Sequence, residues 1–441
     1  MKNHALKLIV VTLLAVSGSA GAADLLEIFH TAQTNDPVYG AARATLEAGK
    51  EKLPQNRSNI LPSVNLSANS TMNRVNAQYL PASGFRSGDF NYNSNGYGVN
   101  LVQPLFRWQN WMSYTEAQLQ VAMSEEQFRI AQQDLILRVS KAYFDVLIAQ
   151  ESVHLAEAQK IAISEQLEQA KRNFEVGSAT ITDTLEAQAR FDQTSAQQIS
   201  VQNDLEIRRR TLQQLIDTMP AELKPLGKEF KPESPQPTEM EKWVEDALVN
   251  NSQLAVARAS SELADKEVAR NRGGHYPTLD MVANYTRNYP NGGNLGQIES
   301  TSKSVGVQLN LSLFQGGMIN SRLREAQANR QRAAQELENA RRTVATQTRQ
   351  AYLGVVSGIA RVEALQQAMA SSESVLEASK LGQEVGVRTN LDVLNAQQQL
   401  YSTRRDLYQA QYNYLYSQLQ LKASVGTLDE DYLASINGAL H

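Results

Sequence analysis

Residues 176–188 of this chain read VGSATITDTLEAQ, and residues 385–397 read VGVRTNLDVLNAQ. Both stretches share the pattern V-G-x-x-T-x-x-D-x-L-x-A-Q, and the second begins 209 residues after the first (385 − 176). Another pair keeps nearly the same spacing, because GVNLVQPLF at 98–106 corresponds to GVQLNLSLF at 306–314. The sequence therefore predicts two tandem copies of one structural unit over nearly the whole chain.

The repeats divide the chain into five expected segments. Lys2, Lys7, the apolar run LIVVTLLAV and an Ala20-Gly21-Ala22 site are typical of a secretory signal peptide, since the apolar run is too short for a membrane span. The stretch between the repeats holds five prolines and is predicted to be a stiff, extended linker. The predicted segments are a signal peptide at 1–22, the first repeat at 23–218, the linker at 219–239, the second repeat at 240–425 and a C-terminal tail at 426–441.

The composition argues against several kinds of partner and site. The formal net charge is −4, or −6 once Lys2 and Lys7 leave with the signal peptide, and there is no basic block, which argues against a nucleic-acid partner. The chain has no cysteine, so we expect no disulfide, no thiolate metal site and no cysteine-linked lipid anchor. No apolar run of about 18 residues follows the signal peptide, so no membrane-spanning helix is expected. Such an exported protein stays in the periplasm or medium, or crosses an outer membrane as β-strands.

Each repeat contains a stretch long enough for a very long helix. From Leu105 to Val176 there is no proline or glycine, and about seventy residues at roughly 1.5 Å each would form a helix about 100 Å long. The matching stretch of the second repeat is interrupted by Gly354, Gly358 and Gly382, but by no proline. In the first stretch, apolar residues follow the 4-3 spacing of a coiled-coil seam: Leu135, Val139, Ala142, Val146, Ala149, Val153 and Ala156. Helices of this kind are typical of rods and tubes.

Two segments in each repeat alternate with the period of a β-strand. We expect strands at about 62–74 and 96–106 in the first repeat and at about 277–288 and 303–314 in the second. In the last of these, valine or leucine stands at every second position from 305 to 313, so one face is apolar and the other is wet. A half-buried strand of a soluble sheet would show the same pattern. A length of about ten residues, with tyrosines near the strand ends, favours transmembrane strands with an aromatic girdle.

The number of strands constrains the assembly. Two strands per repeat give four per chain, and an open four-stranded sheet cannot lie in lipid with unpaired edges. Two chains would form an eight-stranded barrel that its own side chains nearly fill, whereas three chains would form a twelve-stranded barrel with a lumen. We therefore expect a mostly α-helical fold with transmembrane β-strands, in which a homotrimer closes a twelve-stranded outer-membrane barrel on a periplasmic α-helical barrel.

The repeated V-G-x-x-T-x-x-D motif predicts the turn of a helical hairpin in each repeat, at about 176–180 and 385–389. Gly177 and Gly386 stand where a long helix must end, a position that favours left-handed backbone geometry. Each turn leads into a predicted capping box, in which a threonine caps the next helix and an aspartate stands three residues later: Thr180 with Asp183, and Thr389 with Asp392.

These hairpins, together with HYPTLD at 275–280 and TLQQLID at 211–217, occur in an order that resembles the TolC family of outer-membrane channel proteins. The resemblance covers essentially the whole mature chain. It implies a trimer with a twelve-stranded barrel in the outer membrane of a Gram-negative bacterium and a helical tunnel through the periplasm. It also implies docking to a periplasmic membrane-fusion adaptor and to an inner-membrane RND pump or ABC exporter.

The resemblance also assigns roles to single residues. It implies that the hairpin tips meet the adaptor through Val176, Gly177, Val385 and Gly386. It further implies that the second hairpin lines the closed end of the tunnel, where an arginine links neighbouring chains and two aspartates ring the pore. These roles fall on Arg388, whose counterpart in the first repeat is Ala179, and on Asp392, but the second aspartate position holds Asn395. The ring would then carry three carboxylates where a second aspartate would give six, which leaves the strength of the acidic ring open.

No catalytic constellation is found in the sequence. The five histidines are scattered without the spacing of metal ligands, so we expect no metal, no cofactor and no enzymatic activity. The main alternative to a channel is a periplasmic coiled-coil adaptor or scaffold, which would share the signal peptide and the hairpins but lack membrane strands. Drug efflux and protein secretion use the same passive conduit, so the sequence leaves the substrate, the adaptor and the pump open.

Overall fold

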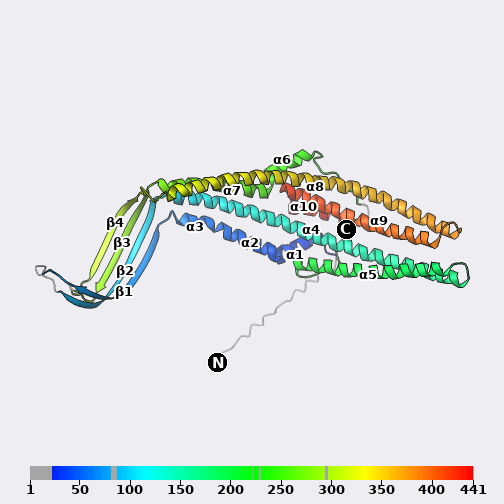
Figure 1. Ribbon diagram of the computed structural model, residues 1–441, viewed down its shortest axis with the longest axis horizontal. Helices are drawn as coiled ribbons and strands as arrows, with labels where there is room; N and C mark the ends of the chain where they lie inside the picture. The colour runs from blue at the N-terminus through cyan, green and yellow to red at the C-terminus, as the bar shows by residue number, and fades with distance from the viewer. Residues whose placement is uncertain (1–21, 81–86, 221, 228–229, 294–295, 441) are drawn as a thin grey trace, which may run out of the picture.

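The structure of this chain is a computed structural model that describes residues 22–80, 87–220, 222–227, 230–293 and 296–440. The predicted signal peptide, apart from Ala22, lies outside the described residues. The molecule is elongated, with a β-sheet at one end and a rod of long helices that ends in two helical hairpins at the other (Figure 1).

Both copies follow the same order of elements, which confirms the tandem-repeat architecture. Each copy has short N-terminal helices, two strands, one very long helix and a shorter helix that returns along it. The first copy consists of α1 (Leu25–Asn35), α2 (Pro37–Lys50), α3 (Lys52–Ser58), β1 (Ser63–Ala77), β2 (Gly88–Phe106), α4 (Trp108–Glu175) and α5 (Ile181–Ile216). The second consists of α6 (Met240–Asn250), α7 (Ser252–Arg272), the 3-10 turn η1 (Gly273–His275), β3 (Thr278–Pro290), β4 (Ser300–Asn310), α8 (Met318–Glu384) and α9 (Asn390–Val425), followed by α10 (Glu430–Asn437).

The two longest helices form the rod. Helix α4 is unbroken over 68 residues, about 100 Å at roughly 1.5 Å per residue, and every residue of its predicted seam is buried. Helix α8 runs for 67 residues, and Gly354, Gly358 and Gly382 do not break it. Each glycine costs a helix about 1 kcal/mol relative to alanine, but α9 packs along α8 and stabilises it. The main core lies where α4 meets α1, α9 and the segment between the repeats.

The four strands form one antiparallel sheet in the order β1-β2-β3-β4. The central pair β2–β3 joins the two copies, with Ser94 opposite Pro290 and Val102 opposite Val282. Within the chain β1 pairs only with β2, and β4 only with β3, so each outer strand leaves one row of backbone N–H and C=O groups unpaired. Over the described residues, we find no helix that combines the length and the apolar composition needed to cross a membrane.

The first β-hairpin is longer than predicted. Strand β1 continues to Ala77 instead of ending near 74, and β2 begins at Gly88 instead of near 96. The added residues are mainly polar, and they keep their register through bonds such as that from Asn76 Nδ2 to Asp89 Oδ1, at 2.6 Å. Backbone pairing and polar cross-strand pairs extend the strands beyond the part that alternates clearly in the sequence.

The second β-hairpin also differs from its predicted bounds. Strand β4 begins at Ser300 and ends at Asn310, so the prediction that it reaches 314 is wrong. It ends there because its partner β3 begins at Thr278, directly after Pro277, which has no backbone N–H to donate. Leu313, whose position continues the alternating pattern, lies outside the strand and is 89% exposed.

The two faces of the sheet differ in chemistry. Side chains of directly opposed residues lie on the same face, so rows can be followed across all four strands. On the face that we call the polar face, one row is Asn65, Asn100, Asn284 and Ser304. On the opposite face, which we call the apolar face, the neighbouring row is Val64, Leu101, Ala283 and Val305. In these rows, the predicted alternation between an apolar and a polar face therefore extends across all four strands.

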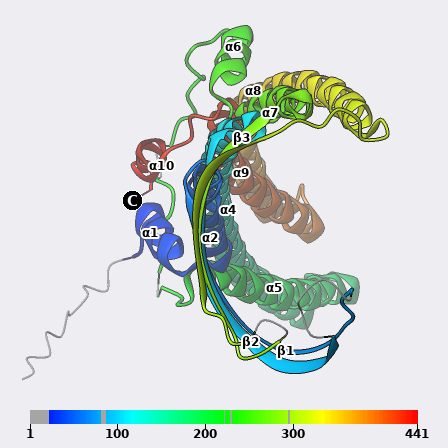
Figure 2. The same ribbon diagram turned by 90° about the vertical axis from the view of Figure 1, so that its left-hand side faces the viewer.

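The segment between the repeats and helix α10 lie on one side of the rod, together with α1 and α6 (Figure 2). The predicted linker is extended, but it is packed against the rod and is not a free spacer. Buried tyrosines hold it: Tyr143 Oη donates to the carbonyls of Ala23 and Lys224 at 3.2 and 2.9 Å, and Tyr412 Oη accepts the N–H of Leu226 at 3.2 Å. The predicted C-terminal tail contains helix α10, which packs against α1.

An ion pair fixes the sheet to the rod. The register of β2 shifts between Pro104 and Phe106, so one extra residue bends the strand towards α4. Arg107, the N-cap of α4, then donates from Nε and Nη2 to both carboxylate oxygens of Asp280 on β3, at 2.7 and 2.6 Å. Asp280 is nearly buried. A planar bidentate pair of this kind restricts the direction of the sheet relative to the helices.

Candidate functional site

The two hairpin tips contain the same backbone turn. Gly177 has a φ of +75° and Gly386 a φ of +81°, the left-handed region that residues with a side chain rarely adopt. After each glycine, one N–H reaches five residues back: Ser178 donates to the carbonyl of Asn173 at 2.8 Å, and Val387 to that of Gly382 at 2.9 Å. This pattern is a Schellman motif, which pairs carbonyls that would otherwise be free at the end of α4 and α8.

Each turn leads directly into a capping box. Asp183 Oδ2 accepts hydrogen bonds from N and Oγ1 of Thr180 at 2.8 and 2.7 Å, and Asp183 N donates to Thr180 Oγ1 at 3.3 Å. Thr389 and Asp392 repeat this arrangement at 2.9, 2.8 and 3.2 Å. These bonds hold the pKa of both carboxyls below the ordinary value of 3.8; the main cause is the Thr180 hydroxyl for Asp183 and the Thr389 backbone N–H for Asp392.

The second tip differs from the first at two linked positions. Arg388 stands where the first tip has Ala179, and Gly382 stands where it has Asn173. A Cβ atom on Gly382 would come within 2.6 Å of Arg388 Cγ, so the arginine side chain lies across the backbone of α8 at this point. Arg388 Nη1 is 3.8 Å from Asp392 Oδ1. Both side chains are more than a third exposed, so this pair contributes little within one chain.

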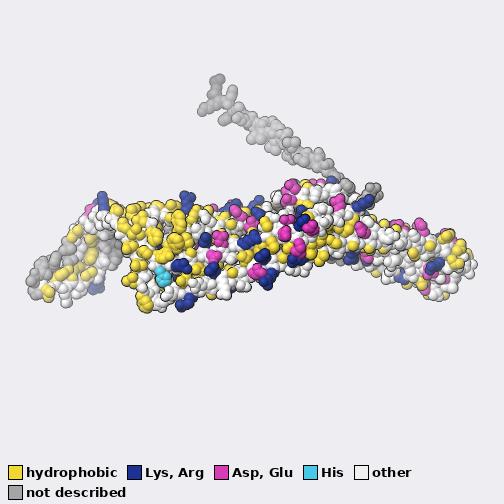
Figure 3. Space-filling model, turned by 90° about the horizontal axis from the view of Figure 1, so that it is seen from above, with side chains coloured by type: hydrophobic (Ala, Val, Ile, Leu, Met, Phe, Trp, Pro, Cys, Tyr) yellow, Lys and Arg dark blue, Asp and Glu magenta, His cyan; other side chains and the backbone are white. Residues whose placement is uncertain are grey.

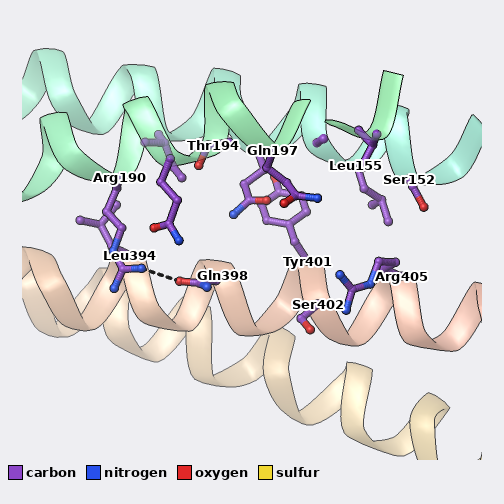
Figure 4. Close-up of a pocket in the computed structure, with 15 residues that line it drawn as sticks. Ser152, Leu155, Arg190, Thr194, Gln197, Leu394, Gln398, Tyr401, Ser402 and Arg405 are labelled. Carbon is purple, nitrogen blue, oxygen red and sulfur yellow. Dashed lines mark hydrogen bonds between the residues drawn. The ribbon is translucent and has the colours of Figure 1, made fainter. Parts of the chain in front are cut away.

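Asn395, the third residue assigned to the pore entrance, contacts the other hairpin instead of lying free. Arg190 on α5 donates from Nη2 to Asn395 Oδ1 at 3.0 Å. It also donates from Nη1 to Gln398 Oε1 at 2.8 Å, the bond drawn as a dashed line in Figure 4. Both acceptors are neutral amides, and within the described part of the chain we find no carboxylate paired with Arg190. No local pattern in the sequence predicts this contact, because it joins residues 205 positions apart.

A cavity of about 200 Å³ lies beside this contact, between α4 and α5 on one side and α9 on the other (Figure 4). Its lining is mainly polar and includes Gln159, Gln193, Gln197, Tyr401, Ser402 and Arg405. The two bonds from Arg190 to α9 therefore cross a region where apolar packing between the hairpins is sparse. Among the described residues, these two bonds are the hydrogen bonds that join α5 to α9.

Both tips also expose apolar side chains at their ends. Val176 is 77% exposed, and Val385 and Val387 are 66% and 76% exposed. Ile181 and Leu391, at the start of the following helices, are exposed as well. Apolar side chains gathered at the end of a rod are typical of a contact surface for another protein.

The tips offer hydrogen bonding and apolar contact but no arrangement suited to metal chemistry. Across the described residues, no group of three or more His, Asp or Glu side chains is placed to hold a metal ion. The two tip aspartates are engaged in capping boxes.

Comparisons with known proteins agree on one family. The sequence profile described as "Outer membrane efflux protein" matches residues 28–218 and 243–427. "Outer membrane protein TolC" of Vibrio cholerae is 34% identical over 428 residues, which cover 96% of this chain and 95% of that protein. "Alkaline protease secretion protein AprF" of Pseudomonas aeruginosa is 33% identical over 420 residues, covering 95% and 87%. The solved Campylobacter jejuni CmeC outer membrane channel has a TM-score of 0.78 at 18% identity, covering 95% of this chain and 90% of that one, which shows a shared fold.

Proposed function

Because this chain belongs to the outer membrane efflux protein family, we propose that three copies of it assemble into one exit duct of the Gram-negative outer membrane. The duct itself, its outer-membrane location and its periplasmic part follow from the family and from relatives named for efflux and for protein secretion. The number of copies is our inference. The relatives match both repeats of this chain, which favours a duct over a periplasmic adaptor without membrane strands.

The observation that carries the trimer is the sheet with two free edges and one apolar face. In lipid, unpaired backbone groups on β1 and β4 would each cost several kcal/mol, so β4 of one copy must pair with β1 of the next. Four strands per chain then give twelve strands from three copies, enough for a lumen. The polar face, with its rows of Asn, Ser and Thr, would line this lumen, and the apolar face would meet lipid.

The surface around the base of the sheet supports the same orientation. Hydrophobic side chains gather on the end of the rod next to the sheet, while charged side chains of both signs are spread over the rest of that view (Figure 3). Exposed aromatic and apolar residues at this junction include Phe106, Trp111, Phe314 and Met318. Aromatic side chains favour the boundary between membrane and water. The junction would therefore lie at the periplasmic boundary of the membrane, with the rod in the periplasm.

We assign partner docking to the two tips, through the exposed Val176 and Val385 and the turns at Gly177 and Gly386. A periplasmic membrane-fusion adaptor would bind there and connect the duct to an inner-membrane RND pump or ABC exporter. The substrate would be selected by those partners, since the duct supplies a passage and, in our proposal, no catalytic step.

The periplasmic entrance would be closed by contacts of the second hairpin. Arg388 is exposed next to Asp392, so it is free to donate to an acceptor on a neighbouring copy, a contact that a charged donor makes strong. Asn395 adds no charge, but through Arg190 it ties α9 to α5 of its own chain. Opening would then require that contacts between chains at Arg388 and the contact within each chain at Arg190 both change.

Engineered disulfides test the trimer directly, because the chain has no cysteine. A cysteine at Ser67 on β1 is combined in turn with cysteines at successive positions of β4. Within one chain β1 and β4 are separated by two strands, about 14 Å at the usual spacing of roughly 4.8 Å, so these pairs form no bond in a monomer. We expect one register to give a covalent trimer on a denaturing gel. A monodisperse monomer in detergent with native β-content, and no crosslink at any position, would contradict the proposal.

A further inference from the structure

Tyrosines and cations form a row across the apolar face of the sheet, near the ends of β3 and β4 that are remote from the rod; the β1–β2 hairpin continues beyond this row. Tyr97 on β2 lies opposite Arg287 on β3, and Tyr285 on β3 lies opposite Lys303 on β4. Lys303 Nζ is 5.8 Å from the centre of the Tyr285 ring, and the guanidinium carbon of Arg287 is 5.0 Å from that of Tyr289. We call these five residues the tyrosine–cation row.

The row stands at the upper limit of the apolar surface. Between it and the rod, the apolar face carries aliphatic side chains such as Leu101, Val305 and Val307. In the duct that we propose above, on which this inference rests, the end of the sheet remote from the periplasmic rod faces the exterior. Tyrosine rings and the ends of long cationic side chains favour the level of the lipid headgroups. The tyrosine–cation row therefore lies at the headgroups of the outer leaflet.

The two cations differ in their counter-ions. Arg287 shares its charge with Glu299, which accepts a hydrogen bond from its Nε at 2.6 Å. Lys303 is exposed, and no carboxylate within the described residues forms an ion pair with it. The strand that would close against β4 in the trimer is β1, and its 15 residues contain neither aspartate nor glutamate. The assembled barrel would thus place no carboxylate next to Lys303 from β3 or from the neighbouring copy's β1. Within its own chain, the row of Lys303 continues as Tyr285, Val99 and Leu66.

We propose that Lys303 binds a phosphate group of a lipid in the outer leaflet, with Arg287 completing a positive rim. The occupant is lipid A, whose headgroup carries phosphates at this level and whose acyl chains would lie along Val305 and Val307. An ammonium group over an aromatic ring, with free donors and no carboxylate acceptor, is complementary to a phosphate ester. The same position offers a zwitterionic or uncharged headgroup no comparable advantage.

The test compares lipid binding by the delipidated trimer and two variants. Native mass spectrometry in detergent would measure binding of lipid A, of its dephosphorylated form and of phosphatidylethanolamine. Lys303→Gln keeps the length and polarity of the side chain but removes its charge. Lys380→Gln is the matched control, because Lys380 is an exposed lysine on α8 near the other end of the molecule.

We expect lipid A to bind in preference to the other two lipids, and Lys303→Gln to weaken its binding about fivefold, the effect of roughly one basic residue near an anionic surface. Lys380→Gln should bind like the wild type. Equal binding of dephosphorylated lipid A, unchanged binding by Lys303→Gln, or displacement of lipid A by millimolar inorganic phosphate would each overturn the proposal. Conductance of the same samples in planar bilayers separates the two inferences. A trimer that conducts but shows no preference for lipid A would contradict the lipid site alone. A protein that neither inserts nor conducts would contradict the duct.

Discussion

The two hairpin tips share one backbone but differ in side chains. Both have a left-handed glycine, a Schellman motif and a Thr–Asp capping box, with matching hydrogen bonds within about 0.1 Å of one another. Only the second tip carries an arginine after the turn, and only there does a glycine in the preceding helix leave room for it. The turn is therefore a structural requirement of each copy. The side chains that differ between the copies indicate that the second hairpin is the one that closes the entrance in our proposal.

Replacing the turn glycines should disrupt the backbone turn that the two tips share. A Gly386→Val substitution forces a β-branched residue into the left-handed region, at roughly 1–2 kcal/mol, and places bulk where a partner would dock. We expect export to fall about tenfold or more while the trimer stays in the membrane. Gly177→Val strains the first tip equally, so it tells whether both tips dock. Unchanged adaptor crosslinking and export in both variants would show that the tips are turns only.

Arg388→Ser should show most clearly that the two tips differ in function. It removes the side chain that we assign to closure between chains and leaves the turn and the capping box intact. We expect single-channel conductance in bilayers to rise severalfold without any exporter present. The matched control is Ala179→Ser at the corresponding position of the first tip, which should conduct like the wild type. If the two variants behave alike, the arginine has no special role at the entrance.

Arg190→Ala tests the contact between the hairpins of one chain. Two hydrogen bonds from a charged donor to neutral amides would be lost, a net cost of about 1–3 kcal/mol per chain once water has replaced them. We expect a smaller rise in conductance than for Arg388→Ser, and a further rise when the two are combined. Arg405→Ala is a suitable control, since Arg405 lines the same cavity but pairs with its neighbour Asp406. An effect equal to that of the control would reduce Arg190 to a surface residue.

The charge of the entrance should depend on Arg190 as well as on the acidic positions. From sequence alone, Asn395→Asp would strengthen block by divalent cations, because it doubles the carboxylates of a ring. The structure changes this expectation: Arg190 already donates to position 395 and would neutralise the new carboxylate. We expect weak additional Mg²⁺ block for Asn395→Asp, strong block when Arg190→Gln is added, and loss of most block for Asp392→Asn. Identical block in all three would leave Asp392 with its capping role only.

The smallest expected effect concerns the capping boxes. Thr180→Ala and Thr389→Ala should each cost about 1 kcal/mol locally, measured as faster amide hydrogen exchange in the first turn of α5 or α9. The pKa of both aspartates is lowered in the folded tip, so the stability they add is present above their ordinary pKa of 3.8 and is lost as the pH falls through the lowered value. Exchange corrected for intrinsic rates should therefore stay constant between about pH 5 and pH 8. A step in that range would point to another titrating group.

The sequence was informative wherever a local pattern decides the structure. The seam of α4 follows from its 4-3 spacing, and the turn and box at each tip follow from V-G-x-x-T-x-x-D, because helix ends are governed by residues within one turn. The strand ends were less predictable, since the end of β4 depends on Pro277 in its partner strand. Arg190 was missed entirely: its bonds to Asn395 and Gln398 depend on how two long hairpins lie against each other, which no spacing records.

The pairing of β2 with β3 has a consequence for the order in which the chain folds. It brings Ser94 opposite Pro290, so the central ladder of the sheet closes a loop of almost 200 residues. Closing so long a loop is entropically costly, and non-local strand pairing is slow compared with helix formation. The α4–α5 hairpin joins residues that are neighbours in sequence and can form at once, whereas the sheet must wait for the second copy. During that interval the β1–β2 hairpin exposes its apolar side chains and both of its strand edges, which makes it prone to aggregation. Tandem duplication thus gave this chain its four strands at the expense of a late, vulnerable step in maturation.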